Sequence, residues 1–354
     1  MRKGAFKWII CALMGSVLLA GCGLIGGEKT SNQIDPPKNV TVTDKKDSQN
    51  KTEAAKQDKK TEAAKRELYL VDKNGYVVPQ TLNLPVAKEN AVMKQALEYL
   101  VKDGPVTDLL PNGFQAVLPV NTTVLGVDVQ KDGTAIADFS ADFKNYKKEE
   151  ERKIVEAVTW TLTQFENVKK VQFRMEGKEL AVMPQNQTPL GKGVSRADGI
   201  NFDDEQVSDI MNTKPVTLYF MAQNKKNTYY VPVTRRIAND KENEVAAVIK
   251  ELVKGPTHRS SLVSDFNHDL KLLNEPKYEN GKVTLNFNEN IYGSTGKNII
   301  SDNVLHSLVL SLTEQKGVQS VAIEVNGKAD ILNEKGEKLT KPVTRPQNVN
   351  TGSF

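Results

Sequence analysis

The sequence predicts an α+β protein made of two tandem copies of one small domain, each with two helices packed on one face of a mostly antiparallel sheet. Three observations predict it. Apolar and turn residues recur about 150 positions apart, and near the end of each copy they do so without a gap. Both copies show the order strand, strand, helix, strand, strand, helix, strand, which is typical of α+β folds. Each predicted helix has one apolar stripe, so the helices should cover one side of a sheet. The matched pairs include Leu68 with Leu218, Tyr69 with Tyr219, Leu162 with Leu312, Val171 with Val321, and Gly177 with Gly327.

The length and composition fit two ordinary folded domains. The chain has 354 residues, of which 38% are hydrophobic and 26% charged, enough for each copy to bury its own core. Without Arg2, Lys3 and Lys7, which a cleaved leader would remove, the 48 basic residues fall to 45 against 44 acidic ones. This balance gives no field that attracts nucleic acid, which we exclude as a partner. The only cysteines, Cys11 and Cys22, lie outside the predicted domains, which therefore hold no disulfide or zinc–thiolate site.

The N-terminus predicts a signal peptide over residues 1–21 and lipid attachment at Cys22. A basic stretch precedes an apolar run of about a dozen residues, too short for a membrane-spanning helix. The following Leu19-Ala20-Gly21-Cys22 resembles a bacterial lipobox. The resemblance implies cleavage before Cys22 and a diacylglyceryl group on its sulfur, whose two chains suffice for stable anchoring. Membrane lipid is thus an expected partner, and plain secretion with an incidental cysteine is the alternative.

Residues 22–66 read as a charged tether. Polar, glycine and lysine residues dominate, and such a segment buries too little apolar surface to offset its ordering entropy. The stretch Lys51–Lys56 recurs as Lys60–Lys65. Its composition favours nascent helix, so the end of the tether is predicted to be a semi-rigid spacer.

The first domain is predicted over residues 67–202, a linker over 203–215 and the second domain over 216–354. In the first domain we expect strands at 67–71 and 76–84, a helix from Val92 to Val101, strands at 124–130 and 134–139, a helix at 149–165 and a strand at 169–175. In the second we expect strands at 217–222 and 229–233, a helix from Val245 to Val253, strands at 270–273 and 282–287, a helix at 301–315 and a strand at 319–325.

Glycine and proline mark the boundaries of these elements. Asn74-Gly75, Asp132-Gly133 and Asn280-Gly281 are hairpin turns. Gly104-Pro105 and Gly255-Pro256 are the expected stops of the first helix in each copy.

Matched residues continue beyond the last predicted strand, so a tail belongs to each domain. Arg196 matches Arg345, and Ile200-Asn201 matches Val349-Asn350. The two arginines are either structural, bonding loop carbonyls, or a shared partner-binding feature.

The acids that could support glycoside cleavage are not shared by the copies. A glycosidase needs two carboxyl groups, and Asp138 and Asp142 are candidates in the first copy. The corresponding residues of the second copy are Asn286 and Asn290. A carboxylate mechanism could therefore persist only in the first copy.

The remaining candidates for chemistry are weak. His258, His268 and His306 all lie in the second copy, without metal-ligand spacing, and Ser260-Ser261 lacks an orienting acid. Gly293–Asn298 does not have the spacing of a phosphate loop. Tyr229-Tyr230 could stack on a sugar or peptide, although strand alternation explains the pair more simply. We therefore predict no catalytic residues, no metal site and no cofactor.

Taken in order, these features resemble the GerM family of sporulation and germination lipoproteins from endospore-forming, Bacillus-like bacteria. The resemblance rests on the lipobox, the tether and a repeated pattern: a Leu-Tyr strand, a helix before Gly-Pro, a hairpin ending in Phe, and a helix with Leu-Thr before Gly-Lys. It covers nearly the whole mature chain. It implies a domain similar to the ring-building motifs of secretion and sporulation channels.

The resemblance also implies a function. We expect a non-enzymatic protein of the envelope or of a mother cell–forespore channel, needed for normal spore peptidoglycan and germination. It would be lipid-anchored at the extracytoplasmic face of the septal or forespore-surrounding membrane, contact other sporulation envelope proteins, and be able to oligomerise. The alternatives are a protein that binds or modifies peptidoglycan and, ranked last, a solute-binding lipoprotein of a transporter. Only Cys22 carries over as a site residue.

Overall fold

A computed structural model describes residues 63–88, 91–203, 212–224, 227–239, 243–292 and 298–351. The predicted signal peptide, Cys22, nearly all of the tether and residues 293–297 lie outside the described residues. None of the described helices is long and apolar enough to cross a bilayer. The predicted domain boundaries stay predictions.

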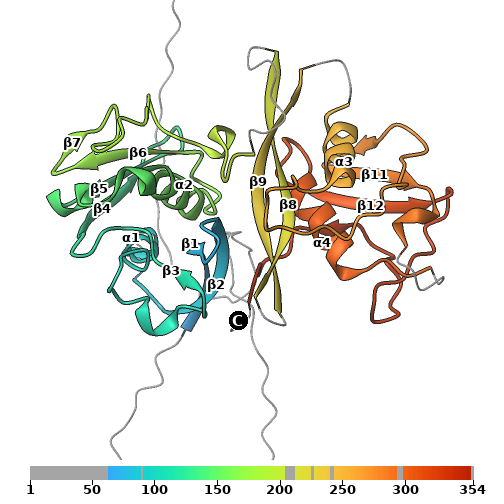
Figure 1. Cartoon of the computed structure of the whole chain (residues 1–354), viewed down its shortest axis with the longest axis horizontal. Coiled ribbons are helices and arrows are strands. Elements are labelled where there is room, and N and C mark those ends of the chain that lie inside the picture. Colours follow the sequence, from blue (N-terminus) through green and yellow to red (C-terminus); the bar gives the residue numbers. More distant parts are fainter. Residues whose placement is uncertain are drawn as a thin grey trace, which may run out of the picture. The chain divides into compact units, whose positions relative to one another are not determined.

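Both repeats contain a hairpin, a helix, two strands, a second helix and two further strands in that order, and the first repeat has one more short strand after its first helix (Figure 1). The first repeat comprises β1 (Ala63–Asp72), β2 (Val77–Pro85), α1 (Val92–Glu98), β3 (Phe114–Gln115), β4 (Val124–Val129), β5 (Thr134–Phe139), α2 (Glu151–Leu162), β6 (Lys170–Met175) and β7 (Lys178–Glu179). The second comprises β8 (Thr213–Asn224), β9 (Asn227–Ala238), α3 (Glu244–Lys254), β10 (Lys277–Glu279), β11 (Lys282–Phe287), α4 (Asp302–Leu312), β12 (Ser320–Val325) and β13 (Val343–Thr344). Short 3-10 helices lie at Thr107–Leu109, Ala141–Lys144, Lys148–Glu150, Arg196–Asp198 and Glu289–Ile291.

The α+β class and the mostly antiparallel pairing are confirmed, but the strands of each repeat form two sheets instead of one. One is the β1–β2 or β8–β9 hairpin, which β3 extends in the first repeat. The other has four strands in the order β4-β5-β6-β7 or β10-β11-β12-β13. Its central pairs, β5–β6 and β11–β12, are parallel, because α2 or α4 connects the two strands as a crossover.

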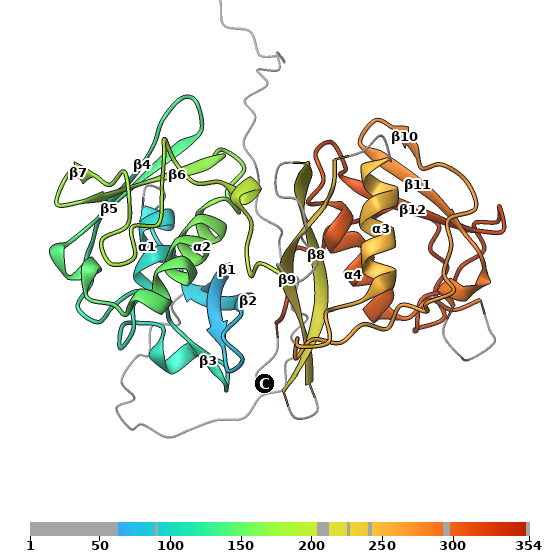
Figure 2. The same cartoon turned by 45° about the horizontal axis from the view of Figure 1, so that its top comes forward.

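The helices lie between the two sheets of their own repeat (Figure 2). In the first repeat α1 contacts β4, and α2 contacts both β6 and the hairpin. In the second, α4 contacts both β12 and β8. The hairpin is therefore the outer layer that remains available for another contact.

Two predicted elements differ from the structure. The first helix was expected to reach Val101, but it ends at Glu98, because the backbone oxygen of Leu100 accepts hydrogen bonds from Val117 and Leu118. The strand expected at 270–273 makes only one bridge, between Leu272 and Phe287. Instead, residues 277–279 pair with residues 282–284, because the tight turn at Asn280-Gly281 joins the residues directly on either side of it.

The end of the predicted tether is also different. Residues 63–65 belong to β1 and pair with residues 83–85 of β2. Strand pairing therefore overrides the helix propensity of the Ala-Ala-Lys sequence there. The predicted tail of the first repeat is packed as expected, since Val194 exchanges backbone hydrogen bonds with Val171 over 2.7 and 2.8 Å.

Both faces of β8 are covered. Every residue from Val216 to Ala222 is buried, whereas a strand with one solvated face alternates between buried and exposed residues. The helices of the second repeat cover one face. The other strand of the hairpin, β9, contacts β2 of the first repeat, and one hydrophobic cluster contains buried residues of both repeats. The contact between the repeats is therefore part of the core.

Candidate functional site: the interface between the two repeats

The two hairpins meet through β2 and β9. Tyr229 of β9 is 1% exposed and reaches into the first repeat. Its hydroxyl donates to Asp72 Oδ2 over 2.7 Å, and its ring packs edge-on against Phe114 at a centroid distance of 5.2 Å. Its neighbour Tyr230 points to the other face of the strand and bonds His306 Nδ1 over 3.1 Å. Strand alternation thus explains the tyrosine pair.

The tail of each repeat crosses to the other repeat, and matched asparagines make the crossing. Asn201 bonds both backbone groups of Val77 in its own repeat and donates to the carbonyl of Pro232 in the second, over 2.7–2.8 Å. Asn350 bonds both backbone groups of Tyr230 in its own repeat and donates to the carbonyl of Pro79 in the first, over 2.8–2.9 Å. We call this pair of contacts the reciprocal clasp.

The backbone around each asparagine strengthens the reciprocal clasp. Ile200 exchanges hydrogen bonds with Thr234 of the second repeat over 2.8 and 2.9 Å. The Thr81 hydroxyl of the first repeat donates to the Val349 carbonyl over 2.8 Å. Asn201 and Asn350 have φ angles of +47° and +55°, a region that asparagine tolerates better than most residues. Matching surfaces thus exchange equivalent contacts, as in a two-fold symmetric dimer.

A charged cluster lies beside the reciprocal clasp. Glu314 accepts hydrogen bonds from Arg196 of the first repeat over 2.8 and 3.2 Å, and pairs with Arg345 of the second over 2.9 Å. Its side chain is 9% exposed. Tyr219 donates to the same carboxylate over 3.0 Å. One buried carboxylate therefore joins the matched arginines of both repeats.

The two arginines of the charged cluster make matching contacts, but the acid between them occurs in only one repeat. Arg196 bonds the Thr163 hydroxyl over 3.0 Å, and Arg345 bonds the Thr313 hydroxyl over 3.2 Å. The residue that corresponds to Glu314 in the first repeat is a neutral Gln164, which bonds the Glu67 carbonyl instead. Burial raises the pKa of the Glu314 carboxyl, but the two guanidinium groups outweigh it, and the net pKa is lowered.

A Glu314→Gln variant tests the role of this carboxylate. It removes the carboxylate with which both partly buried guanidinium groups pair, so we expect the free energy of unfolding to fall by about 3–5 kcal/mol. Urea denaturation of the purified chain measures this. The matched control is Gln164→Ala, which removes neutral hydrogen bonds at the corresponding position and should cost only about 1 kcal/mol. Equal losses in the two variants would contradict a special role for Glu314.

Glu156 of α2 makes the reciprocal clasp sensitive to pH. It is 7% exposed. Its carboxylate accepts from the backbone N–H of Asn201 over 3.2 Å and from Arg152 Nε over 3.1 Å. Burial outweighs both partners and raises the pKa of Glu156 from 4.5 to about 7. The folded protein therefore prefers the protonated form, and this contribution to stability is complete below pH 4.5 and is lost as the pH rises through 7.

A Glu156→Gln variant should remove this pH dependence. Glutamine still accepts the hydrogen bond from Asn201 but carries no buried charge. Relative to the parent chain, the variant should gain stability from pH 5 to pH 9, by roughly 3 kcal/mol at most. Unfolding free energies across that range measure the gain. Glu149→Gln changes an exposed acid just before α2 and should leave the profile unchanged; a matching gain there would contradict the assignment.

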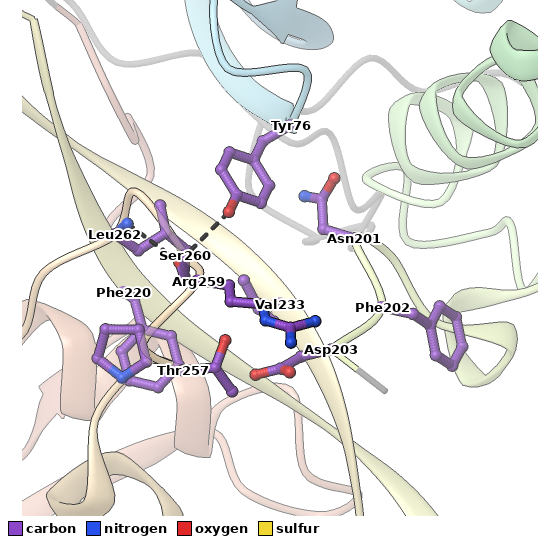
Figure 3. A pocket seen from close by; sticks show the side chains of 11 residues that line it. Tyr76, Asn201, Phe202, Asp203, Phe220, Val233, Thr257, Arg259, Ser260 and Leu262 are labelled. Atoms are coloured by element: carbon purple, nitrogen blue, oxygen red, sulfur yellow. Dashed lines mark hydrogen bonds between the residues drawn. The ribbon is translucent and has the colours of Figure 1, made fainter. Parts of the chain in front are cut away.

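A small pocket opens beside the reciprocal clasp (Figure 3). It has a volume of about 190 Å³ and is lined by Tyr76 and residues 201–203 of the first repeat and by β8, β9 and the loop after α3 of the second. The Tyr76 hydroxyl and Ser260 Oγ lie 3.3 Å apart across it. Behind it, buried Arg235 bonds Asp203 over 2.8 Å and Glu251 over 3.0 Å. The pocket is smaller than most ligand sites, which are roughly 300–1,000 Å³, and its polar residues connect the repeats.

The structure gives most of the other sequence candidates structural roles. Asp138 accepts from the Gly177 backbone N–H over 3.1 Å, and Asn286 accepts from Gly327 over 2.8 Å. The same turn is thus held in both repeats, which explains why an amide can replace this acid. Asp142 accepts from the Asn145 side chain over 3.1 Å.

The histidines and serines are not brought together as a catalytic site. His258 and His268 are exposed, and burial lowers the pKa of His306 beside Tyr230. Besides Tyr76, Ser260 Oγ bonds the Leu262 backbone N–H over 3.0 Å. Within the described residues no cluster of His, Cys, Asp and Glu could hold a metal ion.

The sequence did not identify the acids that bind the matched polar residues of the two tails. Arg196 and Arg345 were singled out, and both lie in the charged cluster, but Glu314 and Glu156 were not. The available signal was identity between the copies at polar positions, as in Arg196 with Arg345 and Asn201 with Asn350. Core positions need only similar apolar residues, so identical polar residues indicate a shared contact.

Comparisons with known proteins agree with the repeat. The family model described as "Germane: Sporulation and spore germination" matches residues 67–181 and again 217–330. The spore germination protein GerM of Bacillus subtilis is 51% identical over 368 residues, covering all of both chains. The solved structure of the tandem GerMN domains of that organism's sporulation protein GerM covers 82% of this chain and all of its own, with 55% identity and a TM-score of 0.78.

Proposed function

The chain belongs to the Germane family of sporulation and spore-germination proteins, and from this premise we propose that it is a non-enzymatic, lipid-anchored scaffold of the sporulating cell envelope. Cys22 would hold it at the extracytoplasmic face of the septal or forespore-surrounding membrane. The paired repeats would contact other envelope or channel proteins and be able to oligomerise. The role would support normal spore peptidoglycan and germination.

One observation carries the scaffold proposal: the polar residues that the repeats share are used to join the repeats. Arg196, Asn201 and Asn350 make contacts across the interface, and Arg345 pairs with the same carboxylate as Arg196. The candidate acid Asp138 supports a turn that Asn286 supports equally well. A chain whose shared polar residues fix the relative position of two domains is suited to hold partners at a set spacing.

A Cys22→Ala variant tests the anchor. Without a sulfur to acylate, the protein should move from the membrane fraction to the soluble fraction of sporulating cells. Fractionation followed by immunoblotting measures this. Cys11→Ala is the matched control, because Cys11 lies in the predicted leader and its loss should leave the protein on the membrane. Membrane retention of the Cys22→Ala protein would refute lipid anchoring at this residue.

An Asp138→Asn, Asp142→Asn double variant tests the non-enzymatic role. Asparagine is present at both corresponding positions of the second repeat, so the fold should be kept while both carboxyl groups are lost. We expect yields of heat-resistant spores and germination rates equal to those of the parent strain. A folded, stable double variant that fails to support germination would instead favour carboxylate catalysis.

A further inference from the structure

A second and larger cavity lies within the first repeat. It has a volume of about 670 Å³, within the rough 300–1,000 Å³ range of small-molecule sites. One wall is α2, the helix labelled in Figure 2, and the other is the loop that follows β7. We call it the α2 cleft. It is lined by Arg152, Val155, Glu156, Thr159, residues 186–191, Gly193, Val194, Asp198 and Gly199.

The loop wall of the α2 cleft is firmly held. Glu151, at the start of α2, accepts backbone hydrogen bonds from Gln185, Asn186 and Thr188 over 2.8–3.0 Å. Burial opposes ionisation of this carboxyl, but the hydrogen bonds from Thr188 and Asn186 outweigh it and lower the pKa of Glu151 to about 2. The cleft is therefore largely pre-formed, which reduces the entropy cost of binding.

The helix wall contains a buried polar group without a partner. Thr159 is 1% exposed, and its hydroxyl makes no hydrogen bond with any described residue. Native proteins pair nearly all such groups, because burying a hydroxyl without a partner costs free energy. Glu156 lies less than one turn away, and Arg152 one turn further. All three line the same cavity.

The second repeat does not reproduce this wall. The residues that correspond to Arg152, Glu156 and Thr159 are Asp302, His306 and Val309. The same helix therefore folds and packs with valine in place of the threonine. The fold does not need the Thr159 hydroxyl, which is therefore free to bind a ligand in the cleft.

The lining determines the class of ligand. Asp198 and Glu156 offer acceptors, Arg152 and the amides of Asn186 and Gln187 offer donors, and Thr159 and Thr188 can do both. Pro189, Leu190 and Val194 add apolar surface. The carboxylate of Asp198 offsets the single guanidinium of Arg152, which disfavours phosphates and other polyanions. Sugars suit such a lining, because each hydroxyl both donates and accepts while the ring carbons pack against apolar side chains.

We propose that the α2 cleft of the first repeat binds a short segment of a glycan chain. Sugar hydroxyls hydrogen-bond Glu156, Arg152 and the Thr159 hydroxyl, and a ring rests on the exposed Pro189. The second repeat lacks this site. The proposal is independent of the scaffold role, since the chain could fail the Cys22 test and still bind sugar.

The mature chain contains its own reporter for binding. Trp160 follows Thr159, and its indole N–H donates to the Gly199 carbonyl over 3.2 Å. Gly199 lines the α2 cleft. The only other tryptophan, Trp8, lies in the predicted leader. A ligand in the cleft should therefore change the fluorescence of Trp160.

The experiment titrates the purified mature chain, solubilised in detergent, with two probes: a tetramer of β-1,4-linked N-acetylglucosamine and cellotetraose. We expect a saturable fluorescence change with at least one of them. Thr159→Val should weaken binding at least tenfold, because valine has the same shape and is the residue that the second repeat uses. His306→Gln, at the position that corresponds to Glu156 in the second repeat, should leave the affinity unchanged.

Each result of the titration either supports or overturns the proposal. Binding of the acetylated tetramer alone supports a glycan bearing N-acetyl groups, and binding of both supports a general glycan site. The absence of saturable binding with either probe overturns the proposal. So does equal affinity of the parent and Thr159→Val chains, once matching unfolding midpoints show that both are folded. A loss in His306→Gln equal to that in Thr159→Val overturns the assignment to the first repeat.

Discussion

The structure depends on two hairpins that are each covered on both faces. A hairpin with one solvated face needs only its own helices, but β8 is buried from Val216 to Ala222 and requires the first repeat to cover it. The two repeats also depend on each other through a buried hydrogen bond, because the Tyr229 hydroxyl donates to Asp72 of the other repeat. The reciprocal clasp and the shared Glu314 add further polar contacts across the interface. The two repeats are best regarded as one folding unit that contains two similar halves.

Local patterns in the sequence predicted most of the elements but not how they assemble. Apolar spacing placed α2, α3 and α4 within a few residues, and Asn280-Gly281 correctly located a hairpin. The early end of α1 at Glu98 could not be predicted, because it depends on hydrogen bonds from Val117 and Leu118, which are distant in sequence. The division into two sheets depends on tertiary packing, in which α2 or α4 contacts both sheets of its own repeat. A single-sequence pattern does not contain that information.

Only some of the interface residues could be identified from the sequence, for a similar reason. Comparison of the copies identified Arg196 and Arg345, because identity at a polar position is informative in a diverged repeat. Glu314 escaped the comparison because its counterpart is Gln164, so the carboxylate that joins the two arginines occurs once. The unpaired hydroxyl of Thr159 is likewise specific to one copy. Symmetric residues thus show how the halves are joined, whereas asymmetric ones show how they differ.

The reciprocal clasp limits the surfaces through which the chain can bind a second copy of itself. In a closed two-fold arrangement each half uses the same surface, and both copies of that surface are occupied within one chain. The chain therefore has no free copy of this surface through which to bind a neighbouring chain head to tail. Any larger array must be built through a different surface, and its subunit would be the whole chain, with the two halves always entering as a pair.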